Sequence, residues 1–178
     1  MAVLIEATSI VTRSDSIQSK FNGGWDAFKA CVPNQTMCAD GEIARIGFMT
    51  PADVESFVKK LERSGLVYLT GGEAIDIAVA DQMRGLVTTC QWLEFGRVNM
   101  GGNPKQRVAA CRFVGSKSME VVTPPGWVYE GSLSHTYGFV PSEHLAKSMK
   151  YLRHENGVDV YLNTVTLEEM YVGRTGEV

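Results

Sequence analysis

The chain has 178 residues, of which 44% are hydrophobic and 21% are charged, and its formal net charge is −3. This length suits one domain, and this hydrophobic content is sufficient to form a buried core. The slightly negative charge gives no electrostatic reason to bind nucleic acid or an anionic membrane, so we expect neither as a partner.

The first predicted element is a strand over residues 3–12, a segment rich in β-branched side chains. A helix is expected to begin at Ser14, and a second one over residues 25–32. Asp40-Gly41 is typical of a type I′ hairpin turn between two short strands, so residues 36–49 are predicted to form a hairpin.

The clearest pattern in the chain begins at Thr50. Thr50 suits the N-cap of a helix, Pro51 suits the first helical position, and Gly65 is a natural C-terminal stop. Apolar residues recur between them at helical spacing, namely Val54, Phe57, Val58 and Leu61. A strand over residues 66–69 is expected to follow this helix.

The order of these elements is strand, helix, strand, strand, helix, strand. This order is that of a split βαβ unit, so we expect the first half of the chain to be ferredoxin-like. Each helix would then cover the sheet on one face.

The second half is predicted to be rich in antiparallel strands. The expected elements are a strand over 74–81, a hairpin of 86–100 with 107–114, and a strand pair or an extended segment over 127–140. A helix that begins at Ser142 and is stopped by Gly157, with Leu145, Met149 and Leu152 facing inward, a strand over 158–162 and a helical turn from Thr166 are expected to follow. Gly101 to Arg107 combines glycines with basic residues, but it joins two strands, which favours a hairpin tip over a phosphate loop.

The fold class that we predict is α+β, as a single domain over residues 1–178. A subdivision into a ferredoxin-like part, 1–81, and a β-rich part with C-terminal helices, 82–178, is the alternative. Helices on one face of the sheet leave the other face to be covered by the second half or by another copy of the chain. We therefore expect a homodimer.

The four cysteines are Cys31, Cys38, Cys90 and Cys111, and none lies at metal-ligand spacing from another cysteine or a histidine. Each lies in an apolar or strand-like context, which is typical of buried thiols in a reducing compartment. The N-terminus lacks the basic region of a signal peptide, and no apolar run reaches the length of a membrane span. We expect a cytoplasmic protein without metal or cofactor.

Three carboxylates lie inside apolar, strand-like runs: Glu6, Asp76 and Glu94. A carboxylate that faces a core must be paired or protonated, which is how catalytic acids arise. Strand alternation favours an outward position for Asp76, whereas Glu94 is expected to share a face with Trp92. Arg112 lies on the expected partner strand and is a candidate counter-ion, so Trp92 and Arg112 are candidate ligand-binding residues.

His135 lies among hydroxyl-bearing residues in Ser132 to Tyr137 that could orient its ring. Together with Glu94 it is the candidate catalytic residue of the chain. Neither belongs to a recognisable catalytic motif.

A binding or regulatory module without a catalytic motif is the function that we predict. One alternative is an enzyme acting on a small molecule, with a sheet-lined pocket that uses Glu94, Trp92 and His135. The other alternative is a protein-interaction module, such as an inhibitor or an immunity-type partner. The fold class by itself does not decide between them.

Overall fold

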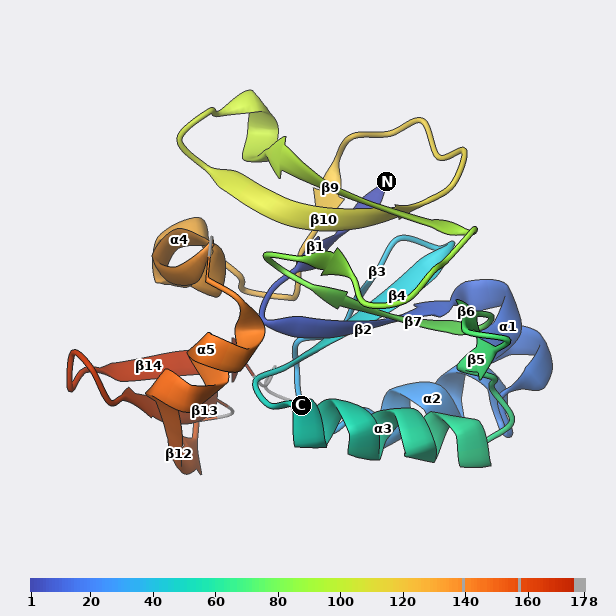
Figure 1. Ribbon diagram of the computed structural model, residues 1–178, viewed down its shortest axis with the longest axis horizontal. Coiled ribbons are helices and arrows are strands. Elements are labelled where there is room, and N and C mark those ends of the chain that lie inside the picture. Colours follow the sequence, from blue (N-terminus) through green and yellow to red (C-terminus); the bar gives the residue numbers. More distant parts are fainter. Residues whose placement is uncertain (139, 157, 175–178) are drawn as a thin grey trace.

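The computed structural model describes residues 1–138, 140–156 and 158–174 and shows an α+β fold built from several antiparallel sheets (Figure 1). The strands are β1 (Ala2–Ile5), β2 (Thr8–Arg13), β3 (Cys38–Ala39), β4 (Ile43–Phe48), β5 (Leu69–Thr70), β6 (Glu73–Ala74), β7 (Ile77–Asp81), β8 (Gly85–Leu86), β9 (Leu93–Asn99), β10 (Arg107–Phe113), β11 (Val121–Val122), β12 (Met149–Glu155), β13 (Val158–Asn163) and β14 (Glu169–Arg174). The helices are α1 (Ser14–Lys20), α2 (Gly24–Cys31), α3 (Pro51–Arg63), α4 (Leu133–Tyr137) and α5 (Ser142–Ser148), with 3-10 turns η1 (Met100–Gly102) and η2 (Tyr129–Gly131).

The central sheet has five strands in the order β3-β4-β2-β7-β8, and all its pairs are antiparallel. Helices α1, α2 and α3 cover one of its faces, as Figure 1 shows. The core of this layer is formed by apolar side chains from both sides, among them Ile10, Ile46, Phe28, Phe57 and Leu61. The predicted apolar stripe of α3 is therefore buried against the sheet.

A second sheet, in the order β11-β1-β10-β9, covers the opposite face of the central sheet (Figure 1). Val3, Ile5, Trp92 and Cys111 pack against Ala78 and its neighbours between the two sheets. Since the second face is covered within the same chain, the reason for which we expected a homodimer no longer holds. Strand β1 also pairs with β10, which joins the two parts of the predicted subdivision.

The C-terminal part forms a third sheet, β12-β13-β14, which lies beside the central layers together with α4 and α5 (Figure 1). Leu145 and Met149 pack there with Leu133 and with Ala7 and Met49 of the central part. This small core holds the third sheet next to the ends of β2 and β4.

The prediction of one strand over residues 3–12 is wrong, because the segment is interrupted. The chain breaks at Glu6 and Ala7, so β1 joins one sheet and β2 the other. Ala7 has a positive φ of 48°, and its N–H donates to the Gln82 side chain at 2.6 Å. Pairing with two different sheets produces this break, and the pattern of side chains along one segment does not reveal which sheet each part joins.

The hairpin at Asp40-Gly41 and helix α3 are both formed where the sequence places them. The Thr50 hydroxyl caps α3 by accepting the Asp53 N–H at 3.2 Å, and Gly65 has a left-handed φ of 107°. The ferredoxin-like arrangement is not confirmed, because β2 runs antiparallel to both of its neighbours, β4 and β7. Residues 66–68 form no strand, since the Val67 N–H donates to the Asp76 carboxylate instead.

Three elements of the second half differ from the prediction. Residues 129–137 form η2 and α4 instead of strands. Ser132 Oγ accepts the His135 N–H and so caps α4. Residue 139 lies outside the described part. The helix that begins at Ser142 ends at Ser148, because the next residues pair with β13. Thr166 begins no helix, since Asn163 Oδ1 accepts its N–H in a turn that leads into β14.

Candidate functional site

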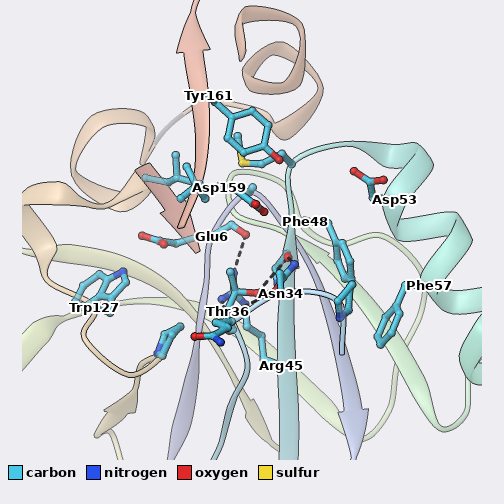
Figure 2. A pocket seen from close by; sticks show the side chains of 18 of the residues that line it. Glu6, Asn34, Thr36, Arg45, Phe48, Asp53, Phe57, Trp127, Asp159 and Tyr161 are labelled. Atoms are coloured by element: carbon cyan, nitrogen blue, oxygen red, sulfur yellow. Dashed lines mark hydrogen bonds between the residues drawn. The ribbon is translucent and has the colours of Figure 1, made fainter. Parts of the chain in front are cut away.

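A cavity of about 850 Å³ lies where α3, the end of β4, the loop over residues 124–133 and the β13-β14 hairpin meet. Figure 2 shows its side chains: Glu6 and Trp127 lie on one side, Phe48 and Phe57 on the other, and Tyr161 lies opposite Arg45. This volume is in the range of cavities that enclose small organic ligands. The cavity is therefore the candidate site of the protein.

Arg45 is the most unusual residue of this cavity. It lies in the middle of β4, and only 2% of its surface is exposed. Its guanidinium donates to Ser9 Oγ at 2.8 Å, to the Thr36 carbonyl at 3.1 Å and to the Glu6 carbonyl at 2.9 Å. Within the described residues it forms no ion pair, and two of its five N–H groups have no acceptor. A buried cation with spare donors thus lines the cavity.

The loop before β3 fixes this arginine in place. The Asn34 amide donates to the Gly47 carbonyl at 2.8 Å, and Thr36 Oγ1 accepts the Gly47 N–H at 2.7 Å. The Thr36 carbonyl then accepts from Arg45 itself. Burial lowers the pKa of Arg45, and the nearby Glu6 charge acts in the opposite direction. An arginine keeps its proton under all such shifts, so the site retains a positive charge.

Glu6 supplies a buried negative charge on the neighbouring wall, with 9% of its surface exposed. Its carboxylate oxygen Oε1 accepts the Ser134 N–H at 2.8 Å and the Ser134 hydroxyl at 2.7 Å. The other oxygen, Oε2, has no hydrogen bond from the described residues. Glu6 lies at the break between β1 and β2, so its side chain does not follow the alternation of either strand and reaches Ser134 at the start of α4.

Aromatic side chains form part of the remaining wall. The rings of Phe48 and Phe57 lie 5.3 Å apart, and both residues are buried. Burial, and then the charges of Asp159 and Asp53, raise the pKa of Tyr161 to about 12, so its hydroxyl is neutral at physiological pH. The indole N–H of Trp127 is buried without an acceptor among the described residues. The cavity therefore offers aromatic surface next to its charged groups.

Several charged side chains at the rim of the cavity are at least partly exposed and already form an ion pair or a hydrogen bond with another side chain or a main-chain carbonyl. Lys59 pairs with Glu55 at 2.5 Å, Lys60 donates to the Cys31 carbonyl at 3.0 Å, and Asp159 lies 2.8 Å from the His154 ring. Solvent-exposed pairs of this kind contribute little to binding. The interior charges of Arg45 and Glu6 are the ones that a ligand would address.

The structure places the candidates from the sequence away from this cavity. Glu94 is exposed and pairs with Arg112 at 2.8 Å on the four-stranded sheet. Trp92 is buried between the two sheets and donates to the Ala74 carbonyl at 3.1 Å, so it does not share the environment of Glu94. His135 is exposed on α4 and contacts the Tyr129 ring, with centroids 5.4 Å apart. None of these four lines the cavity, and their functional roles stay predictions.

Arg45 did not emerge as a site residue from the sequence, and Glu6 emerged only as one of three embedded carboxylates. The feature of the sequence that could have indicated Arg45 is its place as the single charged residue between Ile43 and Met49. For one charged residue in a strand, the simplest interpretation is a side chain that points to solvent. Burial on both faces of β4 excludes that interpretation. Asp76 is a further correction: it is 1% exposed and accepts from Ser16 and Lys20, so it does not point outward.

Comparison of the chain with protein-family models, with curated proteins and with solved structures finds no match. In the described part of the chain, no group of three or more His, Cys, Asp or Glu side chains could hold a metal ion. No helix in that part is long and apolar enough to cross a membrane. The geometry of the cavity is therefore the observation that points to a function.

Proposed function

We propose that this chain is a small-molecule-binding module whose cavity holds an organic ligand by a carboxylate group, with Arg45 as the anchor. The observation that carries the proposal is the buried guanidinium of Arg45, which lines the cavity without an ion-pair partner among the described residues. Arginine binds carboxylates through two parallel N–H donors, and Arg45 has two donors unused.

The walls of the cavity support a ligand with an apolar body. Phe48, Phe57 and Tyr161 present ring surfaces, and the buried charges of Arg45 and Glu6 lie in the same cavity, whose lining also includes charged residues of α3 and Asp159. Small-molecule sites in proteins combine a largely apolar lining with a few polar groups that fix the orientation of the ligand. The polar groups of this cavity would fix the carboxylate, and the rings would cover the rest.

A thermal-shift screen with small aromatic and aliphatic carboxylates at neutral pH tests this function. A ligand present at about 100 times its dissociation constant adds about 2.7 kcal/mol of stability, which such a screen detects readily. The matched ligands are the primary amides of the same acids, which keep the size and lose the charge. We expect stabilisation by acids and much less by their amides.

An Arg45→Lys variant tests the anchor while it keeps the buried charge. Lysine cannot offer the two parallel donors of arginine, so the dissociation constant of a bound carboxylate should rise by about tenfold or more. The near-ultraviolet circular dichroism spectrum shows whether the variant keeps its packed core. Equal binding of acids and amides by the natural chain would refute the proposed function whatever the variant does.

The sequence also led us to expect a regulatory role, a homodimer and a cytoplasmic location. These stay predictions. Light scattering at micromolar concentration decides the question of the dimer, and a mass of one chain would end it.

A further inference from the structure

We infer that the ligand of this cavity is a zwitterion of the amino-acid type, with its carboxylate on Arg45 and its ammonium group on Glu6. This inference rests on the proposed function and narrows the ligand class. It starts from two buried side chains of opposite charge that line one cavity and form no ion pair within the described residues.

The two charges are held apart by other partners. The Glu6 carboxylate is bound by the N–H and the hydroxyl of Ser134, whereas the Arg45 guanidinium is bound by Ser9, Thr36 and the Glu6 carbonyl. Each group can form further hydrogen bonds: Glu6 through its oxygen Oε2, and Arg45 through two N–H donors. A direct contact between them would satisfy both, but the described residues form no such contact, and both side chains line the cavity.

One small molecule can contact both groups, because both side chains line the same cavity. Arg45 Nη2 donates to the main-chain carbonyl of Glu6 at 2.9 Å, whereas the Glu6 carboxylate extends to Ser134. An α-amino acid carries its ammonium and carboxylate groups on one carbon atom. It is thus the smallest kind of molecule that presents a partner to each of the two buried charges.

Charge balance favours a zwitterion over a simple anion. A carboxylate alone would pair with Arg45 and add a second negative charge near Glu6, which is unfavourable where water is excluded. An ammonium group on the same ligand pairs with Oε2 of Glu6 and removes this repulsion. Buried charges are costly unless each is paired and hydrogen-bonded, and a zwitterion leaves neither one unpaired.

The rest of the cavity indicates a large apolar or aromatic side chain. Trp127 lies on the same side of the cavity as Glu6, and Phe48 and Phe57 lie opposite (Figure 2). Ring surfaces of this kind bind aromatic and branched aliphatic groups. The volume of about 850 Å³ also admits a dipeptide, so both sizes belong in the test.

The test measures dissociation constants by isothermal titration calorimetry for two matched series. The first consists of L-phenylalanine, 3-phenylpropionate, which lacks the ammonium group, and 2-phenylethylamine, which lacks the carboxylate. The second consists of the dipeptide Phe-Phe and 3-phenylpropionyl-phenylalanine, which differs only by the missing ammonium group. In at least one series we expect the zwitterion to bind about tenfold or more tightly than its deaminated analogue, the usual gain from a charged hydrogen bond.

A Glu6→Gln variant assigns the effect to the proposed partner. Its amide oxygen can still accept from Ser134, so the variant removes the charge and keeps the shape. The zwitterion should lose affinity, whereas the deaminated analogue should bind as tightly as before or more tightly, because its carboxylate no longer meets the negative charge of Glu6. Glu42→Gln is the matched control, because Glu42 is an exposed carboxylate in the β3-β4 turn that does not line the cavity.

Each remaining outcome counts against a definite claim. If the deaminated analogues bind as tightly as the zwitterions, the zwitterion inference is wrong and the proposed carboxylate site stands. If neither carboxylates nor zwitterions bind at millimolar concentration, or if 2-phenylethylamine binds best, the proposed function and this inference both fall. If Glu6→Gln binds the zwitterion as the natural chain does, the ammonium site is not at Glu6 and the inference is overturned.

Discussion

Gly47 leaves open the space that the guanidinium of Arg45 occupies. The two residues lie on the same side of β4, and a Cβ atom at position 47 would stand 2.4 Å from Arg45 Nη2 and 2.9 Å from Cζ. Real Cβ contacts are not that short, so any other residue at position 47 would displace the guanidinium. The glycine, which itself lines the cavity, therefore determines where the guanidinium can lie.

The first prediction follows from this contact. Gly47→Ala should weaken carboxylate binding by about tenfold, because the methyl group moves the Arg45 donors without removing the charge. Overpacking of this kind also lowers the free energy of unfolding by about 1–3 kcal/mol. Calorimetric titration and urea unfolding measure the two effects.

Gly96→Ala is the control for Gly47→Ala. Gly96 lies in β9, where an added Cβ meets nothing within 4 Å, so this variant should bind and unfold like the natural chain. If Gly47→Ala keeps its affinity as fully as Gly96→Ala does, the position of the guanidinium does not matter for binding.

A second prediction concerns the buried Asp76, which accepts hydrogen bonds from Ser16 Oγ at 2.7 Å, from Lys20 Nζ at 2.8 Å and from the Val67 N–H at 2.9 Å. Asp76→Ala leaves these donors without an acceptor and should lower the free energy of unfolding by about 2–4 kcal/mol. Urea unfolding at pH 7 measures this loss, and Glu42→Ala, at an exposed turn position, should leave the free energy of unfolding nearly unchanged.

The effect of Asp76 should also depend on pH. Burial by itself would raise the pKa of Asp76, but the hydrogen bonds from Lys20, Ser16 and Val67 outweigh it and hold the pKa below its usual value. A lowered pKa in the folded state stabilises the protein above the pKa of the unfolded chain, about 3.9, and this contribution is lost as the pH falls. The difference between the natural chain and Asp76→Ala should therefore shrink below about pH 4; a constant difference would argue against a charged Asp76.

Tyr161 gives a third prediction, at the alkaline end. Its pKa is raised to about 12 by burial and by the charges of Asp159 and Asp53, whereas an unfolded tyrosine titrates near 10. The unfolded chain thus loses this proton first, so the free energy of unfolding should fall as the pH rises from about 10 to 12. Tyr161→Phe should fall less steeply over that interval in urea unfolding, and equal slopes would mean that Tyr161 titrates normally in the fold.

A fourth prediction concerns the thiols, all four of which are free. Burial raises the pKa of Cys38 to about 11 and also raises that of Cys111, and both side chains are inaccessible between the sheets. Cys31 and Cys90 are only partly buried. A thiol reagent at pH 8 should therefore label Cys31 and Cys90 first, and mass spectrometry of digested protein identifies the sites. Fast labelling of Cys38 or Cys111 in the folded protein would contradict the packing of the two sheets.

Some elements of the fold could be predicted because their signals are local. The cap at Thr50, the apolar stripe of α3 and the stop at Gly65 all lie within one stretch of chain, and the structure forms them there. The hairpin at Asp40-Gly41 and the hairpin of β9 with β10 are local in the same sense. The α+β class follows from such elements.

Other elements depend on partners far along the chain. Met149 to Glu155 carries a helical pattern and becomes β12, because β13 offers backbone hydrogen bonds and the ring of Tyr161 packs on that of Tyr151. The break at Glu6 and Ala7 exists because β1 pairs with β10 and β2 pairs with β4 and β7. Sequence periodicity describes one segment at a time, so neither outcome is visible in it.

The sequence by itself determined the class of the fold, the capped helix α3, the two hairpins and the presence of charged residues inside apolar runs. The tertiary structure decided which of those charges meet. Glu6, Arg45, Trp127 and Tyr161 come from four distant parts of the chain and line one cavity, whereas Glu94 and His135 do not line it. The physical reason is that an isolated charge in a strand has two possible faces, and only the packing of a second sheet determines whether either face reaches water.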